Sequence, residues 1–584
     1  MQTKTHAELE SAFYDGIIEQ VKAKKFTYNQ LNQLKRSLSK KYNLKKIPTN
    51  IEILVHAKKK DLSRLKQLQL KPTRSISGVA NVAIMSAPYA CPPQAQCTFC
   101  PGGPNSQFGT VPKSYTGHEP STMRGIRNDY DPYLQVFNRI QQYVLLGHAF
   151  DKIELIIMGG TFTSYSKVYQ EKFIKYAFKA MNDFSDLFFL KNKANSNADK
   201  NEFDIDYFRK FFELPGEMED PIRAKNIKEK LLKLKDKTAL QDEIIRNELS
   251  HIKCVGLTLE SRSDYLKKDF ANYILDLGCT RVEMGIQSVY EKALVAVKRG
   301  NTTEDNIEAI RDLKDLGFKI NLHYMIGLPG IKNKQEDLKG MKQLFSNPEY
   351  RPDMLKIYPC MVFKDTPLYE DFKKGKYTPY TTEVAAKMIA EFKPFVEPYC
   401  RIMRVNRDIP SKMNIAGIDK TNLRQYVDQL QSKCRCIRCR EVGHVYNKAG
   451  KIPQECKLII QKYEASKGKE FFISFEDTKQ DILLGFIRMR YPSQILREEI
   501  TKTSALIREL HVYGPAVMIG KKDKEKTKQV AQHKGLGKQL LEKAEKIAKK
   551  DGKNKMIIIS AVGTREYYAK LGYTLEGPYM CKYL

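Results

Sequence analysis

Three closely spaced cysteines lie in the segment ACPPQAQCTFCPGG, so the chain has to fold around a loop that gathers their thiols. They are Cys91, Cys97 and Cys100, with five residues between the first two and two residues between the last two. Three thiolates at this spacing can hold one face of a cubane iron–sulfur cluster and leave one iron open to a small molecule, whereas an electron-transfer cluster normally has four cysteines. The alternative is a zinc site that a distant residue such as His118 completes.

A second cysteine group lies in the basic segment CRCIRCRE and consists of Cys434, Cys436 and Cys439. The chain has 12 cysteines, and because they cluster instead of spreading along 584 residues, metal binding in a reducing compartment is a better interpretation than disulfides. Three thiolates beside arginines suit structural zinc, with three free thiols in an RNA-facing loop as the alternative. The candidates for a fourth zinc ligand are His444, Cys400 and Cys456.

Apolar strands alternate with helical segments through the middle of the chain. The segment 153–161, IELIIMGGT, predicts a buried strand that ends at Gly159 and Gly160, where backbone amides can approach a ligand. Further strands are expected to begin at Cys254, Thr280, Lys319 and Met354. The helical segments between them predict a parallel, barrel-like sheet. The polar residues expected to line its mouth are Glu260, Arg262, Glu283, Gln287, Ser288 and His323.

An excess of basic residues predicts a polyanionic partner. The 100 lysines and arginines exceed the 68 acidic residues by 32, which favours nucleic acid through counterion release. Between Lys22 and Lys71 nearly all charges are basic and are interleaved with Tyr28 and Tyr42, which predicts short helices with one phosphate-binding face. No apolar run approaches the roughly 20 residues of a membrane span, and residues 1–20 lack a signal-peptide pattern, so a cytoplasmic protein is expected.

The C-terminal region has a different pattern. From about Lys457 two apolar runs predict antiparallel strands, and the turn from Gln532 to Gly537 opens a helix where backbone N–H groups favour a pyrophosphate. A plain helix cap is the alternative interpretation of this turn. Together with the strand MIIISAVG and the segment REYYAKLGY, the turn resembles the GNAT acetyltransferase fold, whose ligand is acetyl-coenzyme A.

The GNAT resemblance implies a set of contacts with acetyl-coenzyme A. The strand residues expected to pair with its pantetheine arm are Glu509, Leu510, His511 and Val512. The residues expected to hold its pyrophosphate are Leu536, Gly537 and Lys538. Tyr568 is expected near the thioester. Core packing is the alternative for Tyr567 and Tyr568, of which only one need face the ligand.

Longer motifs narrow the resemblance. The first cysteine segment continues as CPGGPNSQFGTVPKSYTGHEPSTMRGIRNDYDP and is followed by DKIELIIMGGTF, GCTRVEMGIQSVYE, RVNRDIP, REVGH and RELHVYG. These motifs resemble the Elongator catalytic subunit family, in which a partial (β/α) barrel of the radical S-adenosylmethionine type is joined to a GNAT domain. The catalytic residues that the resemblance implies are Cys91, Cys97, Cys100, Lys152 and Tyr568. The cofactor contacts that it implies in the barrel are Lys152, Gly159, Gly160 and Gln287.

The expected fold is α/β, with a partial barrel, a C-terminal α+β acetyltransferase domain and a helical basic N-terminus. The expected domains are a tRNA-binding module at 1–74, the barrel at 75–399, a zinc-binding linker at 400–456 and the GNAT domain at 457–584. A polar insertion at about 191–240 interrupts the barrel and predicts a surface excursion or a partner site.

The implied function is synthesis of 5-carboxymethyluridine in tRNA. A reduced [4Fe–4S] cluster would cleave S-adenosylmethionine, and the resulting radical would take hydrogen from the methyl group of acetyl-coenzyme A. The carbon radical would add to C5 of the wobble uridine, and hydrolysis of the thioester would follow. The expected partners are tRNA, an electron donor and other Elongator-type subunits.

Two other functions fit parts of this pattern. The first is a protein lysine acetyltransferase with a structural iron–sulfur cluster, which a net charge of +32 disfavours because it repels basic substrates. The second is an RNA-binding scaffold, which explains the charge but gives neither cofactor site a role.

Overall fold

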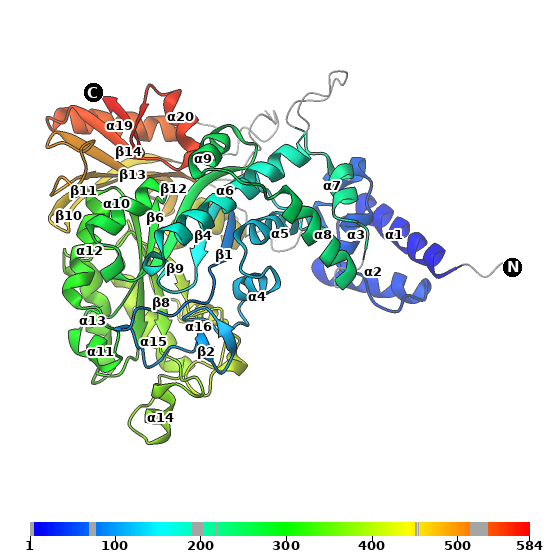
Figure 1. The fold of residues 1–584 in the computed structure, drawn as a ribbon, viewed down its shortest axis with the longest axis horizontal. Helices are drawn as coiled ribbons and strands as arrows, with labels where there is room; N and C mark the ends of the chain where they lie inside the picture. The colour runs from blue at the N-terminus through cyan, green and yellow to red at the C-terminus, as the bar shows by residue number, and fades with distance from the viewer. Residues whose placement is uncertain are drawn as a thin grey trace.

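The computed structural model has three regions, with a parallel sheet at the centre (Figure 1). The described residues are 5–68, 78–189, 202–216, 220–449, 453, 455–513 and 535–584. The N-terminal helices lie to one side of the molecule, and the C-terminal domain lies across one end of the central sheet (Figure 1). Among the described helices, none combines the length and the apolar character that a bilayer-spanning segment requires.

The N-terminal region consists of short helices, as expected from its sequence. They are α1 (His6–Ala23), α2 (Tyr28–Lys41) and α3 (Asn50–His56), followed by 3₁₀ turns at Lys59–Arg64 and Lys66–Leu68. Each helix begins with a capping box formed by Thr5, Thr27 or Thr49. The apolar faces form a small core that includes Phe13, Ile17, Leu31, Leu38 and Ile53. Most basic side chains therefore stay at the surface, although Lys35 is buried and donates a hydrogen bond to Asn50.

The expected parallel sheet forms the central region. In the described chain its strands are β1 (Ala80–Met85), β4 (Lys152–Met158), β5 (Lys253–Ser261), β6 (Arg281–Gln287), β7 (Lys319–Ile326), β8 (Met354–Pro359) and β9 (Arg401–Val405). Every neighbouring pair is parallel, and the strands follow one another in chain order. Within the described residues β1 and β9 do not pair, so the barrel is open, which confirms the predicted partial (β/α) barrel.

The helices that follow β1 run from α4 to α18, and several of them cover the outer face of the barrel (Figure 1). Those before β7 are α4 (Pro120–Arg127), α5 (Pro132–Leu145), α6 (Lys167–Phe188), α7 (Ile205–Phe211), α8 (Pro221–Leu234), α9 (Leu240–Leu249), α10 (Lys268–Asp276), α11 (Glu291–Ala296) and α12 (Thr303–Asp315). Those after β7 are α13 (Lys334–Ser346), α14 (Pro367–Lys373), α15 (Thr382–Phe392), α16 (Leu423–Gln429), α17 (Ile437–Arg440) and α18 (Val442–Ala449). A hairpin of β2 (Gly103–Ser106) and β3 (Gly109–Val111) follows the first cysteine group.

The segment expected to be a polar insertion connects the N-terminal helices to the barrel. Residues 190–201 and 217–219 lie outside the described part of the chain, and much of the remainder forms α7 and α8. Arg209 of α7 donates hydrogen bonds to the carbonyl oxygens of Leu54 (3.2 Å) and Ala57 (2.7 Å) at the end of α3. This part of the insertion therefore packs inside the molecule and is not only a surface excursion.

The C-terminal domain contains a second sheet. Its described strands are β10 (Lys457–Ala465), β11 (Gly468–Asp477), β12 (Ile482–Tyr491), β13 (Ser504–Val512), β14 (Lys555–Ile559), β15 (Thr574–Glu576) and β16 (Tyr579–Tyr583). The order is β10-β11-β12-β13-β14-β16-β15, and within it β13 and β14 are parallel. The helices of the domain are α19 (Leu536–Lys550) and α20 (Arg565–Ala569).

Buried ion pairs join the C-terminal sheet to the amino ends of the barrel strands. Arg508 of β13 donates two hydrogen bonds, of 2.6 and 2.7 Å, to the Asp353 carboxylate just before β8, and one to the carbonyl oxygen of Phe318 before β7. Arg490 of β12 pairs with Asp315 of α12 at 2.6 Å. All four charged side chains are fully buried. Burial alone would raise the pKa of Asp353, but the Arg508 guanidinium holds it below its usual range.

We expect Arg508→Met to destabilise the protein strongly. The substitution leaves the Asp353 carboxylate buried without its main partner, which typically costs about 3–5 kcal/mol. Urea denaturation should show a loss of this size in the free energy of unfolding. The matched control is Arg435→Met, because Arg435 pairs with Asp481 at the surface and such pairs contribute about 0–1 kcal/mol. Equal losses in the two variants would contradict the prediction.

Candidate functional site

The first cysteine loop is attached to the turn between α11 and α12. The backbone N–H of Gln96 donates to the carbonyl oxygen of Lys298 at 3.1 Å, and that of Thr98 donates to Val297 at 3.0 Å. Gly300 has φ +81°, and a methyl group there would lie 2.2 Å from the carbonyl oxygen of Gln94. Only glycine allows this approach, so the loop and the turn form one rigid unit at the end of β6.

The three thiols of this loop have different neighbours. None is in a disulfide, and all three are partly exposed. Cys91 Sγ lies 3.8 Å from the Thr161 hydroxyl, Cys97 Sγ accepts a hydrogen bond from Arg299 at 3.4 Å, and Cys100 Sγ accepts one from the Ser114 N–H at 3.3 Å. Burial and the neighbouring Cys100 raise the pKa of Cys91. Three free thiols in electrostatic contact fit the ligands of an anionic cluster.

The spacing of the sulfur atoms separates the cluster from the zinc alternative. Within the described residues, Cys434, Cys436 and Cys439 are the one group of three ligating side chains whose donor atoms all lie within 4.8 Å of one another. A single zinc ion with Zn–S bonds of about 2.3 Å needs that proximity. The first cysteine group is spread more widely, which suits a larger cluster. His118, the expected partner in the zinc alternative, packs its ring edge against Phe108.

Two barrel strands end beside the cysteine loop. β4 ends at Gly159 and Gly160, with φ +131° and +98°, and a methyl group at Gly159 would lie 2.1 Å from the Ser86 hydroxyl. Gln287 ends β6 with φ +63°, and a methyl group at Gly285 would lie 2.7 Å from its side-chain nitrogen. The structure thus places the predicted strand-end residues at the same end of the barrel as the thiols.

Charged side chains form a network in the barrel interior, between its two ends. Glu283 contacts His323 at 3.3 Å, Arg281 at 3.6 Å and the Lys356 ammonium group. Burial would raise the pKa of Glu283, but Lys356 and His323 hold it well below its usual range. Glu260 accepts a hydrogen bond from the Tyr115 hydroxyl at 2.7 Å.

The expected mouth residues are therefore only partly brought together. Glu260, Glu283 and His323 share the interior network, since His323 also lies 3.9 Å from Glu260. Arg262 instead pairs with Asp264 at 2.8 Å. Ser288 accepts the N–H of Tyr290 at 3.1 Å and so stabilises the turn after β6.

The second cysteine group lies at α17, beside the start of β9. Cys436 is buried, Cys434 is partly exposed and Cys439 is exposed. Among the candidates for a fourth ligand, His444 lies 3.0 Å from the Glu441 carboxylate. The Cys400 side chain is buried, and the backbone carbonyl oxygen of Cys400 accepts the N–H of Ile437 at 2.9 Å. Cys456 is exposed. The triad can hold one metal ion, and the fourth ligand stays open.

The predicted coenzyme residues meet at the start of α19. Gly535 precedes the helix with φ +68°. A methyl group at Gly537 would lie 3.1 Å from the Tyr567 hydroxyl and 3.7 Å from a methyl carbon of Val512. The start of α19, the end of β13 and α20 therefore come together, as the GNAT resemblance implied. Gln532, His533 and Lys534 lie outside the described residues.

The end of β13 extends past its neighbour. The β13–β14 ladder runs from Ser504↔Lys555 to Ile507↔Ile558, while β13 continues to Val512. Residues 509–512 are therefore paired with β12 but extend beyond the ladder with β14. The edge of β13 that faces away from β12 is therefore free of β14 at these residues, and a pantetheine arm can add to the strand along this edge.

The two adjacent tyrosines of α20 have different environments. Tyr568 is 8% exposed and lies in the core of the C-terminal domain, and its burial raises its pKa. Tyr567 is 42% exposed, and its hydroxyl faces Gly537. The sequence prediction named Tyr568 as the residue near the thioester. Adjacent residues of a helix point about 100° apart, so only one of the two tyrosines can face this site.

Lys152 begins β4, at the end of the barrel opposite to the cysteine loop. It pairs in register with Lys253 of β5, whose ammonium group lies 3.2 Å from the Glu566 carboxylate of α20. Lys152 and Gly159 are seven positions apart, which is about 23 Å at roughly 3.3 Å per residue. The structure therefore brings Lys152 towards the C-terminal domain and separates it from the three thiols.

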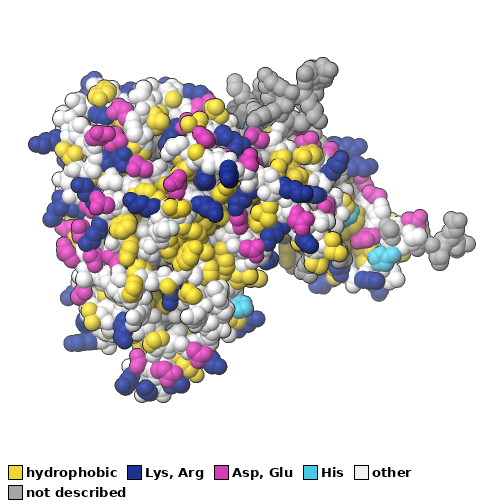
Figure 2. Space-filling view, in the orientation of Figure 1, with side chains coloured by type: hydrophobic (Ala, Val, Ile, Leu, Met, Phe, Trp, Pro, Cys, Tyr) yellow, Lys and Arg dark blue, Asp and Glu magenta, His cyan; other side chains and the backbone are white. Residues whose placement is uncertain are grey.

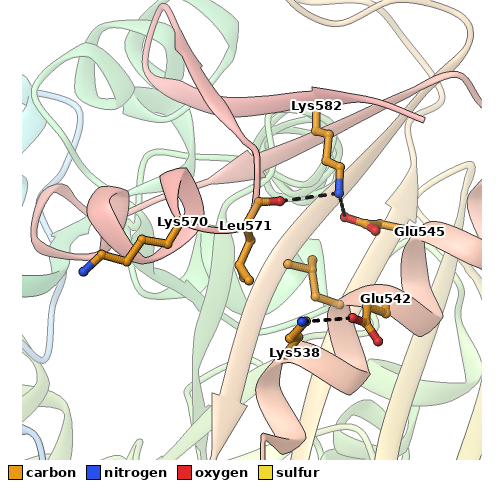
Figure 3. A pocket seen from close by; sticks show the side chains of 7 residues that line it. Lys538, Glu542, Glu545, Lys570, Leu571 and Lys582 are labelled. Carbon is orange, nitrogen blue, oxygen red and sulfur yellow. Dashed lines mark hydrogen bonds and ion pairs between the residues drawn. The ribbon is translucent and has the colours of Figure 1, made fainter.

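A pocket lies between α19, the turn after α20 and β16 (Figure 3). Its lining residues are Lys538, Leu541, Glu542, Glu545, Lys570, Leu571 and Lys582. Lys582 pairs with Glu545 at 3.1 Å, and Lys538 lies 3.7 Å from Glu542. These lysines are balanced by carboxylates, and of the predicted coenzyme residues only Lys538 borders the pocket.

Four segments of the chain match known families. Residues 89–340 match the radical SAM superfamily, and residues 352–432 match the Radical_SAM C-terminal domain. Residues 11–76 match the ELP3 N-terminal domain. Residues 527–582 match the acetyltransferase (GNAT) domain.

Similar proteins cover nearly the whole chain. The tRNA uridine(34) acetyltransferase of Methanocaldococcus jannaschii is 43% identical over 92% of this chain and 90% of its own length. The Elongator complex protein 3 of Saccharomyces cerevisiae is 39% identical over 94% of this chain and 91% of its own length. The solved structure of archaeal Methanocaldococcus infernus Elp3 with an N-terminal deletion of residues 1–46 has a TM-score of 0.68 and 38% identity, covering 87% of this chain and 100% of that one.

We expect Cys436→Ala to lower thermal stability and zinc content together, because a structural zinc site contributes folding free energy. Differential scanning fluorimetry and metal analysis of the purified protein measure the two effects. The matched control is Cys581→Ala, which removes a buried thiol outside the group. A Cys436→Ala protein with unchanged stability and one zinc per chain would show that the group is not a structural zinc site.

Proposed function

The chain belongs to the Elongator complex protein 3 family, and on this basis we propose that it modifies the wobble uridine of tRNA by radical S-adenosylmethionine chemistry. The proposed product is 5-carboxymethyluridine, whose two added carbons come from acetyl-coenzyme A. One observation carries the proposal. A single chain holds a three-cysteine loop at the carboxyl ends of its barrel strands and an acetyltransferase-type sheet against their amino ends.

The thiols of Cys91, Cys97 and Cys100 are the proposed ligands of a [4Fe–4S] cluster. Three ligands leave one iron open, and a cluster bound there supplies the electron that cleaves S-adenosylmethionine. The backbone of Gly159 and Gly160, which have no side chains, is proposed to approach S-adenosylmethionine, with Gln287 as a further contact.

The proposed surface for tRNA is the N-terminal helical region. Lys and Arg side chains lie over these helices (Figure 2). The exposed basic residues of this region include Lys24, Lys25, Arg36, Lys40 and Lys41. Tyr28 is 75% exposed and offers a ring for base stacking. Phosphate contacts of this kind bind tRNA without reading its sequence.

The proposed site for acetyl-coenzyme A is the junction of β13, α19 and α20. Residues 509–512 offer the backbone for the pantetheine arm, and Leu536, Gly537 and Lys538 offer the amino end of a helix for the pyrophosphate. The Tyr567 hydroxyl faces this junction, so we add Tyr567 to Tyr568 as a candidate near the thioester. Lys152 is the barrel residue proposed to reach the same coenzyme.

A structural zinc ion, the partners of the protein and its location are also proposed. Cys434, Cys436 and Cys439 are the proposed ligands of a structural zinc ion. An electron donor, other Elongator-type subunits and a cytoplasmic location stay predictions from the sequence.

We expect Cys97→Ala to abolish release of 5′-deoxyadenosine and formation of 5-carboxymethyluridine while tRNA affinity stays within a few fold, because the cluster reacts and the basic surface binds. The test uses anaerobically reconstituted protein with S-adenosylmethionine, acetyl-coenzyme A and tRNA, and nucleoside mass spectrometry. Cys279→Ala, which removes a buried thiol outside both cysteine groups, is the control. Unmodified tRNA with wild-type protein, together with acetylation of a lysine peptide, would favour a protein acetyltransferase.

We expect Lys152→Ala to weaken the use of acetyl-coenzyme A roughly ten-fold or more, because a lost charge-assisted hydrogen bond typically costs about 1.5–3 kcal/mol. Kinetics of tRNA modification against coenzyme concentration measure the effect, and cluster content and tRNA affinity should not change. Lys172→Ala removes an exposed lysine of α6 and is the control. Identical coenzyme dependence in the two variants would show that Lys152 does not share the coenzyme.

A further inference from the structure

We propose that Arg299 raises the reduction potential of the iron–sulfur cluster held by Cys91, Cys97 and Cys100, and so favours the reduced state that cleaves S-adenosylmethionine. The inference rests on the proposed function, because it needs a redox-active cluster at these thiols. Arg299 follows α11 in the segment VKRGN and is not among the site residues predicted from the sequence.

The guanidinium of Arg299 lies between the cysteine loop and the end of β6. Its Nη1 donates a hydrogen bond to Cys97 Sγ at 3.4 Å, and its Nη2 donates one to the carbonyl oxygen of Gly285 at 2.9 Å. The residue is 9% exposed. The charge is therefore placed directly against a cluster ligand and largely shielded from water, where electrostatic interactions are strong.

Backbone geometry keeps Arg299 in this position. The turn that carries it is hydrogen-bonded to the cysteine loop through Val297 and Lys298. A methyl group at Gly285 would lie 2.8 Å from Arg299 Nη2, so the missing side chain makes room for the guanidinium. The backbone on both sides of the contact between Arg299 and Cys97 is therefore held together.

The positive charge has no acidic partner close by. Within the described residues no carboxylate forms an ion pair with Arg299, and Asp264, which contributes to its electrostatic environment, pairs with Arg262 at 2.8 Å. The Nε of Arg299 has no hydrogen-bond partner in the described chain. A buried cation without a counter-charge is costly, and thiolates with an anionic cluster would provide that counter-charge.

The effect on the potential follows from the charge balance. Reduction transfers one electron from an external reductant to the cluster, with no bond broken and no proton moved, so the cluster and its thiolates gain one negative charge. A fixed cation and an N–H···S hydrogen bond at Cys97 stabilise this state more than the oxidised one. Removal of the charge should therefore make the cluster harder to reduce.

The test is a redox titration of the full chain with dithionite, monitored by electron paramagnetic resonance after anaerobic reconstitution. We expect Arg299→Met to lower the ratio of reduced to oxidised cluster at least ten-fold at a fixed potential, which corresponds to a shift of about 59 mV for one electron. Arg299→Lys keeps the charge and should recover most of the shift. Arg127→Met, which removes an exposed arginine at the end of α4, should titrate like the wild type.

The outcomes separate this inference from the proposed function. A wild-type protein that binds no four-iron cluster would overturn the proposed function itself. A wild-type cluster whose potential is the same in Arg299→Met would overturn only the role of Arg299. If Arg299→Met binds no cluster, Arg299→Gln replaces it as the uncharged variant. Equal reduction potentials in Arg299→Gln and Arg299→Lys would then overturn the inference.

Discussion

The buried ion pair between Arg508 and Asp353 holds the C-terminal sheet against the amino ends of the barrel strands. Arg490 and Asp315 form a second buried pair at the same interface. Such pairs tolerate little displacement, because an unpaired charge in the interior is costly. The position of the acetyltransferase-type domain, and with it the location of α20 beside Lys253, follows from these contacts.

This arrangement places two candidate sites at opposite ends of one parallel sheet. The thiols lie where the strands end, with Gly159 and Gly160, and Lys152 lies where β4 begins. Parallel strands all point in the same direction, so any residue at a strand start is a strand length away from the mouth. A reaction that uses both sites has to bring the acyl group across this distance, and the charged network around Glu283 lies between the ends.

Local patterns were good predictors of the fold. Strand–helix alternation predicted the parallel, barrel-like sheet, and the spacing of Cys91, Cys97 and Cys100 predicted a shared loop. Contacts between distant residues were not predictable. Arg299 reaches Cys97 across 202 positions, and the partly polar insertion packs against the end of α3 through Arg209. Of the adjacent Tyr567 and Tyr568, packing against α19 determines which hydroxyl faces the coenzyme junction.

The sequence by itself determined the ligands that the chain offers, namely two thiol triads, glycine strand ends and a basic N-terminus, because these depend on residue type and short spacing. Only the tertiary structure decided which of them share a site. It separated Cys434, Cys436 and Cys439, whose sulfurs are close enough for one ion, from the wider first group. It also placed the guanidinium of Arg299 beside the Cys97 thiol, since burial and long-range packing, not local propensity, set where charges meet.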